Sequence, residues 1–184
     1  MNYRKWIQDY IVNVHGFPES DDLMTILLDD DEHKHPTFMN ITEALKALSE
    51  QSQPGDAVFI QFSGHGGRVL DSPIDSEAES YDEVIVPSDY ANSGLVRDTL
   101  IFKTLLAPMR YGVTVTILID CCDTGMVLDL PYAWATRTDR PDTIAKVRKW
   151  KGCSACGGVF SLLRLSLSNL HLFSLSLIIA DDTE

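Results

Sequence analysis

Two short strands, each followed at once by a polar motif that contains glycine, constrain the fold of this chain more than any other feature. Residues 56–62 and 113–119 are runs of β-branched, aromatic and other apolar residues bounded by turn-forming glycine or proline. Such nearly continuous apolar runs indicate strands that are covered on both faces. The motif FSGHGG at 62–67 ends the first run, and the motif DCCDTG at 120–125 follows the second. Both runs are therefore expected to be inner, parallel strands.

The two motifs bring one histidine and one cysteine to the same edge of the predicted sheet. In open α/β sheets, reactive groups collect where parallel strands end at their carboxyl side. His65 and Cys122 both stand there, and their separation is close to the roughly 50 residues between the corresponding residues of one cysteine protease clan. Each alone fits a plainer role, the histidine in a turn and the cysteine as a small buried side chain. Together they favour a cysteine nucleophile with a general base.

The remaining apolar pattern predicts an α/β three-layer fold. The first helix has an apolar stripe made of Trp6, Ile7, Tyr10, Ile11 and Val14, and the second would be capped by Thr37 or Asn40. A sheet of this kind normally begins with a buried strand, and none precedes the first helix, so that strand is expected to be missing. The expected elements are a helix over 3–14, a strand over 24–28, a helix over 40–50, the strand over 56–62, a short strand over 84–86, a helical stretch over 98–106 and the strand over 113–119.

Composition limits the partners and the compartment. The chain has 184 residues, enough for one domain with a sizeable core, and a formal net charge of −12. Such acidity argues against nucleic acid or an anionic membrane as a partner. Four cysteines without a signal peptide indicate a reducing compartment, so a cytoplasmic location is expected. The oligomeric state is not indicated.

Several short motifs in the right order then resemble the catalytic, large-subunit region of a type I metacaspase of plant type. They lie between Trp6 and Tyr132 and read GFPES, PT, PGD, FSGHG, YDE and LDLPY. The resemblance implies a caspase-like three-layer sandwich with a mostly parallel central sheet, here incomplete. It implies a catalytic domain over 1–133, a flexible basic linker over 134–156 and an atypical segment over 157–184. Its Leu/Ser-rich run at 162–179 suggests a retained intron or a frameshift.

The resemblance also assigns roles to residues of the two motifs. Cys122, third in the Asp-x-Cys motif, would be the nucleophile, and His65 would promote the thiolate and later protonate the leaving amine. The backbone amides of Gly66 and Cys122 would bind the oxyanion. Asp120 would lie in the S1 pocket and favour arginine or lysine before the scissile bond. A plainer alternative for Asp120 is a strand-end residue that caps the following turn.

A set of acidic residues suggests a calcium site. Calcium prefers several carboxylate oxygens, and the resemblance implies ligands at Asp82, Asp98 and Asp129. A fourth acid of the family falls on Arg97, whose positive charge should weaken binding or change its geometry. The alternative is an ordinary solvated acidic loop. A second departure is Asp123, where the family commonly has histidine, and its carboxylate would reduce the thiolate fraction.

The sequence thus predicts a cysteine endopeptidase of metacaspase type, calcium-stimulated, that cleaves cytosolic proteins after Arg or Lys in regulated cell death or proteostasis. Three alternatives stay open. The chain would otherwise be an inactive binding or regulatory module, a redox or metal-binding protein that uses cysteines such as those of the CSAC motif at 153–156, or a plain α/β scaffold.

Overall fold

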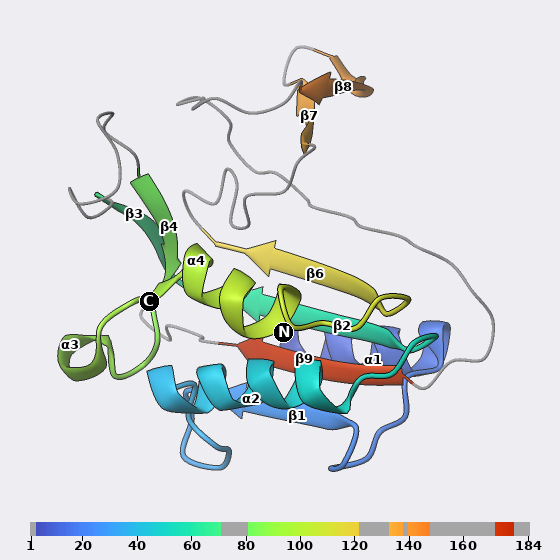
Figure 1. Cartoon of the computed structure of the whole chain (residues 1–184), viewed down its shortest axis with the longest axis vertical. Helices are drawn as coiled ribbons and strands as arrows, with labels where there is room; N and C mark the ends of the chain where they lie inside the picture. The colour runs from blue at the N-terminus through green and yellow to red at the C-terminus, as the bar shows by residue number, and fades with distance from the viewer. Residues whose placement is uncertain (1–2, 71–80, 122–132, 138–139, 148–171, 179–184) are drawn as a thin grey trace.

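A four-stranded parallel sheet forms the centre of the fold. The computed structural model describes residues 3–70, 81–121, 133–137, 140–147 and 172–178. Along the sheet the strand order is β1-β9-β2-β6, and every neighbouring pair is parallel (Figure 1). The strands of this sheet are β1 Met24–Leu28, β2 Ala57–Ser63, β6 Thr114–Asp120 and β9 Leu172–Ile178.

Two smaller antiparallel sheets accompany the central one. The first, in the order β3-β4-β5, is formed by β3 Gly66–Leu70, β4 Tyr81–Ile85 and β5 Val96–Arg97. The second pairs β7 Ala133–Arg137 with β8 Arg140–Val147, in the range expected to be a linker. The strand expected at 84–86 is longer and begins earlier, and it belongs to the three-stranded sheet because it pairs with both β3 and β5.

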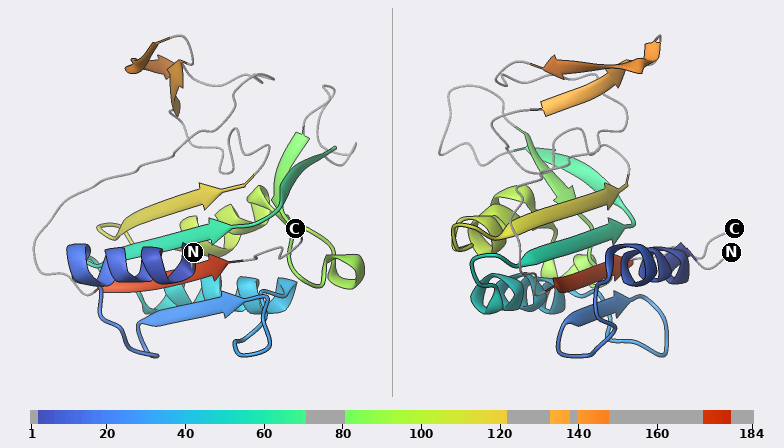
Figure 2. Two further views of the ribbon diagram at one scale, coloured as in Figure 1. Left: turned by 180° about the vertical axis from the view of Figure 1, so that it is seen from behind. Right: turned by 90° about the vertical axis from the view of Figure 1, so that its right-hand side faces the viewer.

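Helices lie on both faces of the parallel sheet. One face carries α1 Tyr3–His15, and the other carries α2 Phe38–Gln51 and the short helices α4 Asp98–Ile101 and η1 Phe102–Leu106 (Figures 1 and 2). The remaining short helix is α3 Tyr90–Ser93. The predicted α/β three-layer class with a parallel central sheet is confirmed. Within the described ranges, no helix is long and apolar enough to cross a membrane.

Local signals explain where the two long helices begin and end. The Thr37 hydroxyl accepts a hydrogen bond from the Asn40 N–H at 3.2 Å, so α2 begins at Phe38, two residues before the expected start. At the end of α1, Gly16 has a φ of 74°, and its N–H donates to the Val12 carbonyl at 3.1 Å. Glycine takes this left-handed conformation without steric cost, so it ends the helix.

The apolar stripe of α1 is narrower than the sequence predicts. Ile7 and Ile11 are buried, but Trp6, Tyr10 and Val14 are exposed at 61%, 44% and 64%. Ile11 packs with Phe17 and Met24 in a small cluster on this face of the sheet. Among the described residues, Ile7 and Ile11 are covered but the side chains beside them are not, so the wider stripe was wrong.

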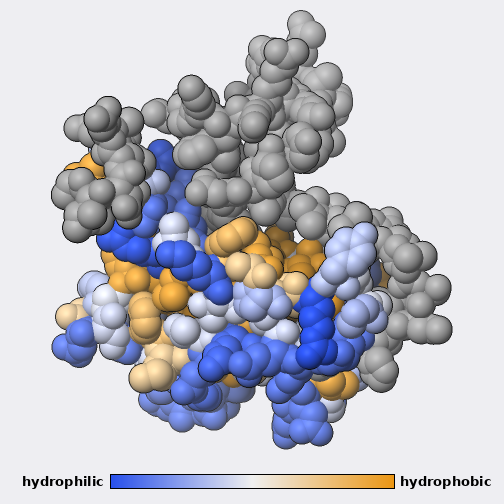
Figure 3. All heavy atoms as spheres, viewed as in Figure 1, coloured by the Kyte–Doolittle hydropathy of each residue, from blue (hydrophilic) through white to orange (hydrophobic). Residues whose placement is uncertain are grey.

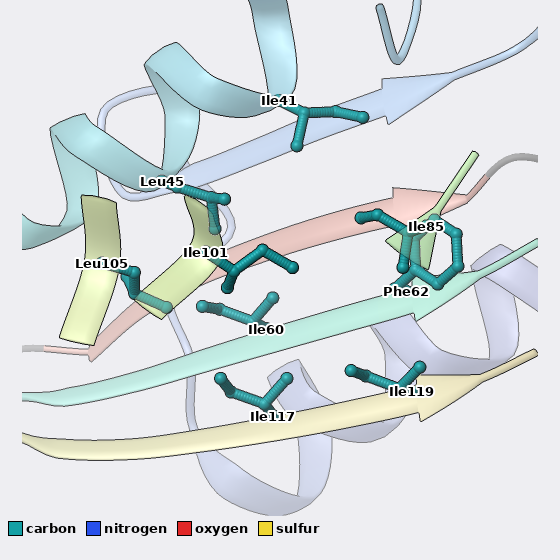
Figure 4. A pocket seen from close by; sticks show the side chains of 9 residues that line it. All are labelled: Ile41, Leu45, Ile60, Phe62, Ile85, Ile101, Leu105, Ile117 and Ile119. Atoms are coloured by element: carbon teal, nitrogen blue, oxygen red, sulfur yellow. The ribbon is translucent and has the colours of Figure 1, made fainter. Parts of the chain in front are cut away.

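The main core lies between the sheet and the α2 face. Ile41, Leu45 and Leu48 of α2 pack against alternate residues of β2, which are Val58, Ile60 and Phe62. A small apolar cavity of about 20 Å³ remains there among nine side chains from α2, α4, η1 and strands β2, β4 and β6 (Figure 4). On the face viewed in Figure 3, polar side chains cover the lower part, and apolar ones reach the surface near the middle.

Strand β9 comes from the segment that was expected to be atypical, yet it lies inside the sheet. It pairs in parallel with β1 on one side and with β2 on the other, so that Leu175 stands level with Thr25 and with Ile60. Without β9, β1 would not be joined to β2 in this sheet. A strand is thus present between β1 and β2.

Proline at position 175 tests how much the sheet depends on β9. Leu175→Pro removes a backbone donor in a strand that is paired on both sides, so the free energy of unfolding is expected to fall by roughly 2–4 kcal/mol. Urea denaturation followed by circular dichroism measures it. Ala145→Pro in β8 is the matched control, because β8 has β7 as its single partner among the described strands. Equal losses in the two variants would contradict a central role for β9.

Candidate active site

The register of β2 and β6 aligns the two motifs at one edge of the sheet. The strands run in parallel (Figure 1). Ser63 stands level with Asp120 at their carboxyl ends. The Gly64 N–H donates to the Asp120 carbonyl at 3.2 Å, which carries the pairing one residue beyond β2. His65 and Cys122 each follow their aligned residue by two positions. His65 is described, whereas Cys122 lies outside the described residues.

His65 is held through its backbone and keeps its side chain exposed. Its carbonyl accepts the Val86 N–H at 3.0 Å, just beyond the end of β4. The next residue, Gly66, begins β3 and stands opposite Ile85 of β4. The histidine is therefore fixed between the parallel sheet, through Gly64, and the antiparallel sheet, through Val86. An exposed imidazole on a fixed backbone can exchange protons with a bound substrate.

The end of β6 presents two different side chains. Asp120 is exposed, and Cys121 is partly exposed and packs against the main core cluster. The exposed carboxylate of Asp120 is open to a cationic group, as an S1 residue must be, and the S1 role stays a prediction.

Two of the residues expected to bind calcium already accept hydrogen bonds from other groups. Asp82 accepts a 2.7 Å hydrogen bond from the Arg97 guanidinium, and one Asp98 oxygen accepts the Thr99 N–H at 2.6 Å. Asp129 lies outside the described residues. Within the described ranges, no group of three or more His, Cys, Asp or Glu side chains is arranged to hold a metal ion. The described residues thus bring together no metal site, and the role of calcium is untested by them.

Sequence reasoning missed one residue that organises this end of the sheet. Asp89, which follows the loop after β4, accepts hydrogen bonds from the Phe38 N–H at 2.7 Å and the Ser93 hydroxyl at 2.6 Å. It thus ties the first turn of α2 to the loop after β4. Burial raises the pKa of the Asp89 carboxyl, but these hydrogen bonds lower it more, so its net pKa lies below the usual 3.8. The local sequence does not predict this role, because Asp89 and its partner Phe38 are 51 positions apart.

Asp89→Asn is expected to lower stability near neutral pH by on the order of 1–2 kcal/mol, because the amide has a single acceptor oxygen and its NH2 group cannot accept the second hydrogen bond. The folded-state pKa lies below 3.8, so the charged form stabilises the fold above that value. This contribution is lost as the pH falls through the folded-state pKa. Urea denaturation at neutral pH and near pH 2 measures the difference, with the exposed Glu50→Gln as the control. A difference that does not shrink in acid would contradict this role.

Comparison with known proteins now identifies the family. A profile described as "Metacaspase, peptidase C14 domain" matches residues 1–131. This chain belongs to the metacaspase family. It is 44% identical over 126 residues to Metacaspase III c of Phaeodactylum tricornutum, covering 68% of this chain and 37% of that protein. It is 39% identical over 151 residues to Metacaspase-2 of Arabidopsis thaliana, covering 79% and 35%.

A further metacaspase and a solved structure were also found. Metacaspase-1A of Neurospora crassa is 39% identical over 139 residues, which cover 74% of this chain and 30% of that protein. A solved protein from Geobacter sulfurreducens aligns at 27% identity with a TM-score of 0.41, over 50% of this chain and 33% of that one. The chain spans about a third of the length of the curated metacaspases that it matches. The resemblance to metacaspases, and with it a cysteine peptidase family, is confirmed.

Proposed function

We propose that this metacaspase chain is a cysteine endopeptidase that cleaves after arginine or lysine, with Cys122 as nucleophile and His65 as its proton-transfer partner. The observation that carries the proposal is the aligned end of β2 and β6, tied by the Gly64–Asp120 hydrogen bond. This register sets Ser63 level with Asp120, where the chain enters the two motifs. Family membership supports the same chemistry.

The chemistry needs three contributions from this edge of the sheet. The Cys122 thiolate would attack the substrate carbonyl carbon, and the amides of Gly66 and Cys122 would stabilise the oxyanion. His65 would donate a proton to the leaving amine as the peptide bond breaks and leaves a thioester. His65 would then take a proton from water, which hydrolyses the thioester and restores the thiol. Asp123, next to the nucleophile, would lower the thiolate fraction and slow turnover.

Specificity for basic residues rests on charge. The exposed Asp120 carboxylate would form a charge-assisted hydrogen bond with a guanidinium or ammonium group. The net charge of −12 also favours the approach of cationic segments. Acidic residues before the scissile bond would be repelled by the same carboxylate.

Cys122→Ala is expected to reduce cleavage of a fluorogenic arginyl peptide by at least roughly 10³-fold, because the nucleophile is lost. The matched control is Cys121→Ala, which removes the neighbouring thiol and should keep turnover within about threefold. His65→Ala should lose activity on the same scale as Cys122→Ala. Equal cleavage by wild type and Cys122→Ala would exclude this chemistry. If Cys121→Ala and Cys122→Ala lose cleavage equally, the loss is not specific to Cys122, and the assignment of Cys122 as the nucleophile is contradicted.

Asp120→Asn is expected to lower kcat/KM for an arginyl peptide by roughly 100-fold, since a desolvated cation would lose its charged partner. A peptide with a neutral residue at that position should change by less than about threefold. Both peptides are assayed with the same enzyme preparations. Because Asp120 is exposed, the melting temperature should stay close to that of wild type. An equal loss for both peptides would assign Asp120 to folding or catalysis rather than to specificity.

A further inference from the structure

An arginine side chain already neutralises one of the acids expected to bind calcium. In the three-stranded sheet, Arg97 of β5 stands opposite Val84 of β4, and Asp82 lies two residues from Val84 on the same face. Such diagonal neighbours are within reach of a long side chain. The Arg97 Nη1 atom lies 2.7 Å from the Asp82 Oδ2 atom. The Asp82 side chain is 12% exposed and that of Arg97 is 42% exposed, so the pair is partly shielded from water.

This part of the fold requires a cation. Asp82, Glu83 and Asp98 are all buried, and a buried carboxylate is costly unless it is paired. Glu83 has its own basic neighbour, because the Arg68 guanidinium lies 3.5 Å from its carboxylate. Arg97 is the corresponding cation for Asp82. Each of two neighbouring residues on β4 is thus matched by an arginine from the strand beside it.

The Arg97–Asp82 pair is connected to His65 through β4. Asp82 lies in β4, and Val86, directly after that strand, donates its N–H to the His65 carbonyl at 3.0 Å. Gly66, next to His65, stands opposite Ile85 of the same strand. A contact that holds β5 against β4 therefore also holds the strand that fixes the His65 backbone. Arg97 does not touch the reacting atoms and would act as a positioning residue.

A divalent cation would compete with Arg97 for the same oxygen. Calcium binds carboxylate oxygens at about 2.3–2.6 Å, and the guanidinium already occupies one Asp82 oxygen at hydrogen-bond distance. The fixed positive charge of Arg97 would also repel a second cation at this distance. Guanidinium groups remain protonated at any pH at which the protein is folded. Arg97 therefore keeps its positive charge both with and without calcium in solution.

We propose that Arg97 serves as a built-in cation that replaces calcium beside Asp82 and holds β4, and with it His65, in place without a metal ion. The chain would then fold to its working form in the absence of calcium and respond little to its addition. The part of this proposal that concerns turnover rests on the proposed peptidase function. The part that concerns calcium binding and stability does not.

Calcium binding and thermal stability test the proposal on the full chain. Wild type should have the same melting temperature within about 1 °C in EGTA and in millimolar calcium chloride, and calorimetry with calcium chloride should detect no binding in the millimolar range. Arg97→Asp should melt several degrees lower in EGTA, because two carboxylates then face each other, and should recover on addition of calcium. Arg97→Lys keeps the charge and should remain insensitive to calcium.

A double variant in which the two charges are exchanged distinguishes loss of the ion pair from a general loss of packing. Asp82→Arg combined with Arg97→Asp restores opposite charges across the same two strands, so it should recover at least half of the stability lost in Arg97→Asp when both are measured in EGTA. If Arg97→Asp does not fold, the wild type and Arg97→Lys measurements still decide the question. A wild type that is stabilised by calcium, or destabilised by EGTA, would overturn the proposal.

Turnover provides the last measurement. With an arginyl peptide, kcat/KM of wild type should be equal within about twofold in EGTA and in calcium, whereas that of Arg97→Asp should fall by roughly tenfold or more in EGTA and recover in calcium. Wild-type turnover that requires calcium would overturn the proposal. If wild type cleaves no peptide under either condition, the peptidase proposal fails, and the calcium and stability results still decide the role of Arg97.

Discussion

The parallel pairing of β2 with β6 is the constraint on which the candidate site depends. Because Ser63 stands level with Asp120, and Gly64 donates to the Asp120 carbonyl, the chain segments that carry the histidine and the cysteine leave the sheet side by side. A slip of one residue would turn the alternating side chains of β2 to the opposite face and remove Val58, Ile60 and Phe62 from the main core. The core packing that stabilises the sheet therefore also fixes Ser63 relative to Asp120, the positions from which the two motifs start.

Local sequence signals predicted the elements that surround the site, and tertiary contacts account for what they missed. The strands β2 and β6 and the helix α2 follow from apolar runs and the Thr37 cap, which act within a few residues. The Leu-Ser alternation at 174–177 is a period-two signal for β9, but it lies outside the residues that the family profile matches, and its partners lie far away in sequence. Arg97 stands out in the sequence because the resemblance places an acid there. Its contact with Asp82 depends on the register of β4 and β5, which the local sequence does not predict.

Several carboxylates lie in partly or fully buried positions of this fold, and they are stabilised in different ways. Asp82 and Glu83, neighbours on β4, are each matched by an arginine from an adjacent strand. Asp89 has no need of a cation in its described contacts, because a backbone N–H and a hydroxyl donate to it. Hydrogen bonds from neutral donors stabilise a carboxylate at lower desolvation cost than a buried ion pair. Both of these arginine–carboxylate contacts lie in the three-stranded sheet next to His65.

The position of β9 also bears on the order in which the chain can fold. Of the described strands, β9 is the last to be synthesised, but it lies between β1, which is the first, and β2. During translation, β1 and β2 are complete long before the strand that separates them, and each then has an open hydrogen-bonding edge. Pairing across such a long stretch of chain closes a large loop and slows folding. The nascent chain is consequently exposed to edge-to-edge association until its final described strand enters the sheet.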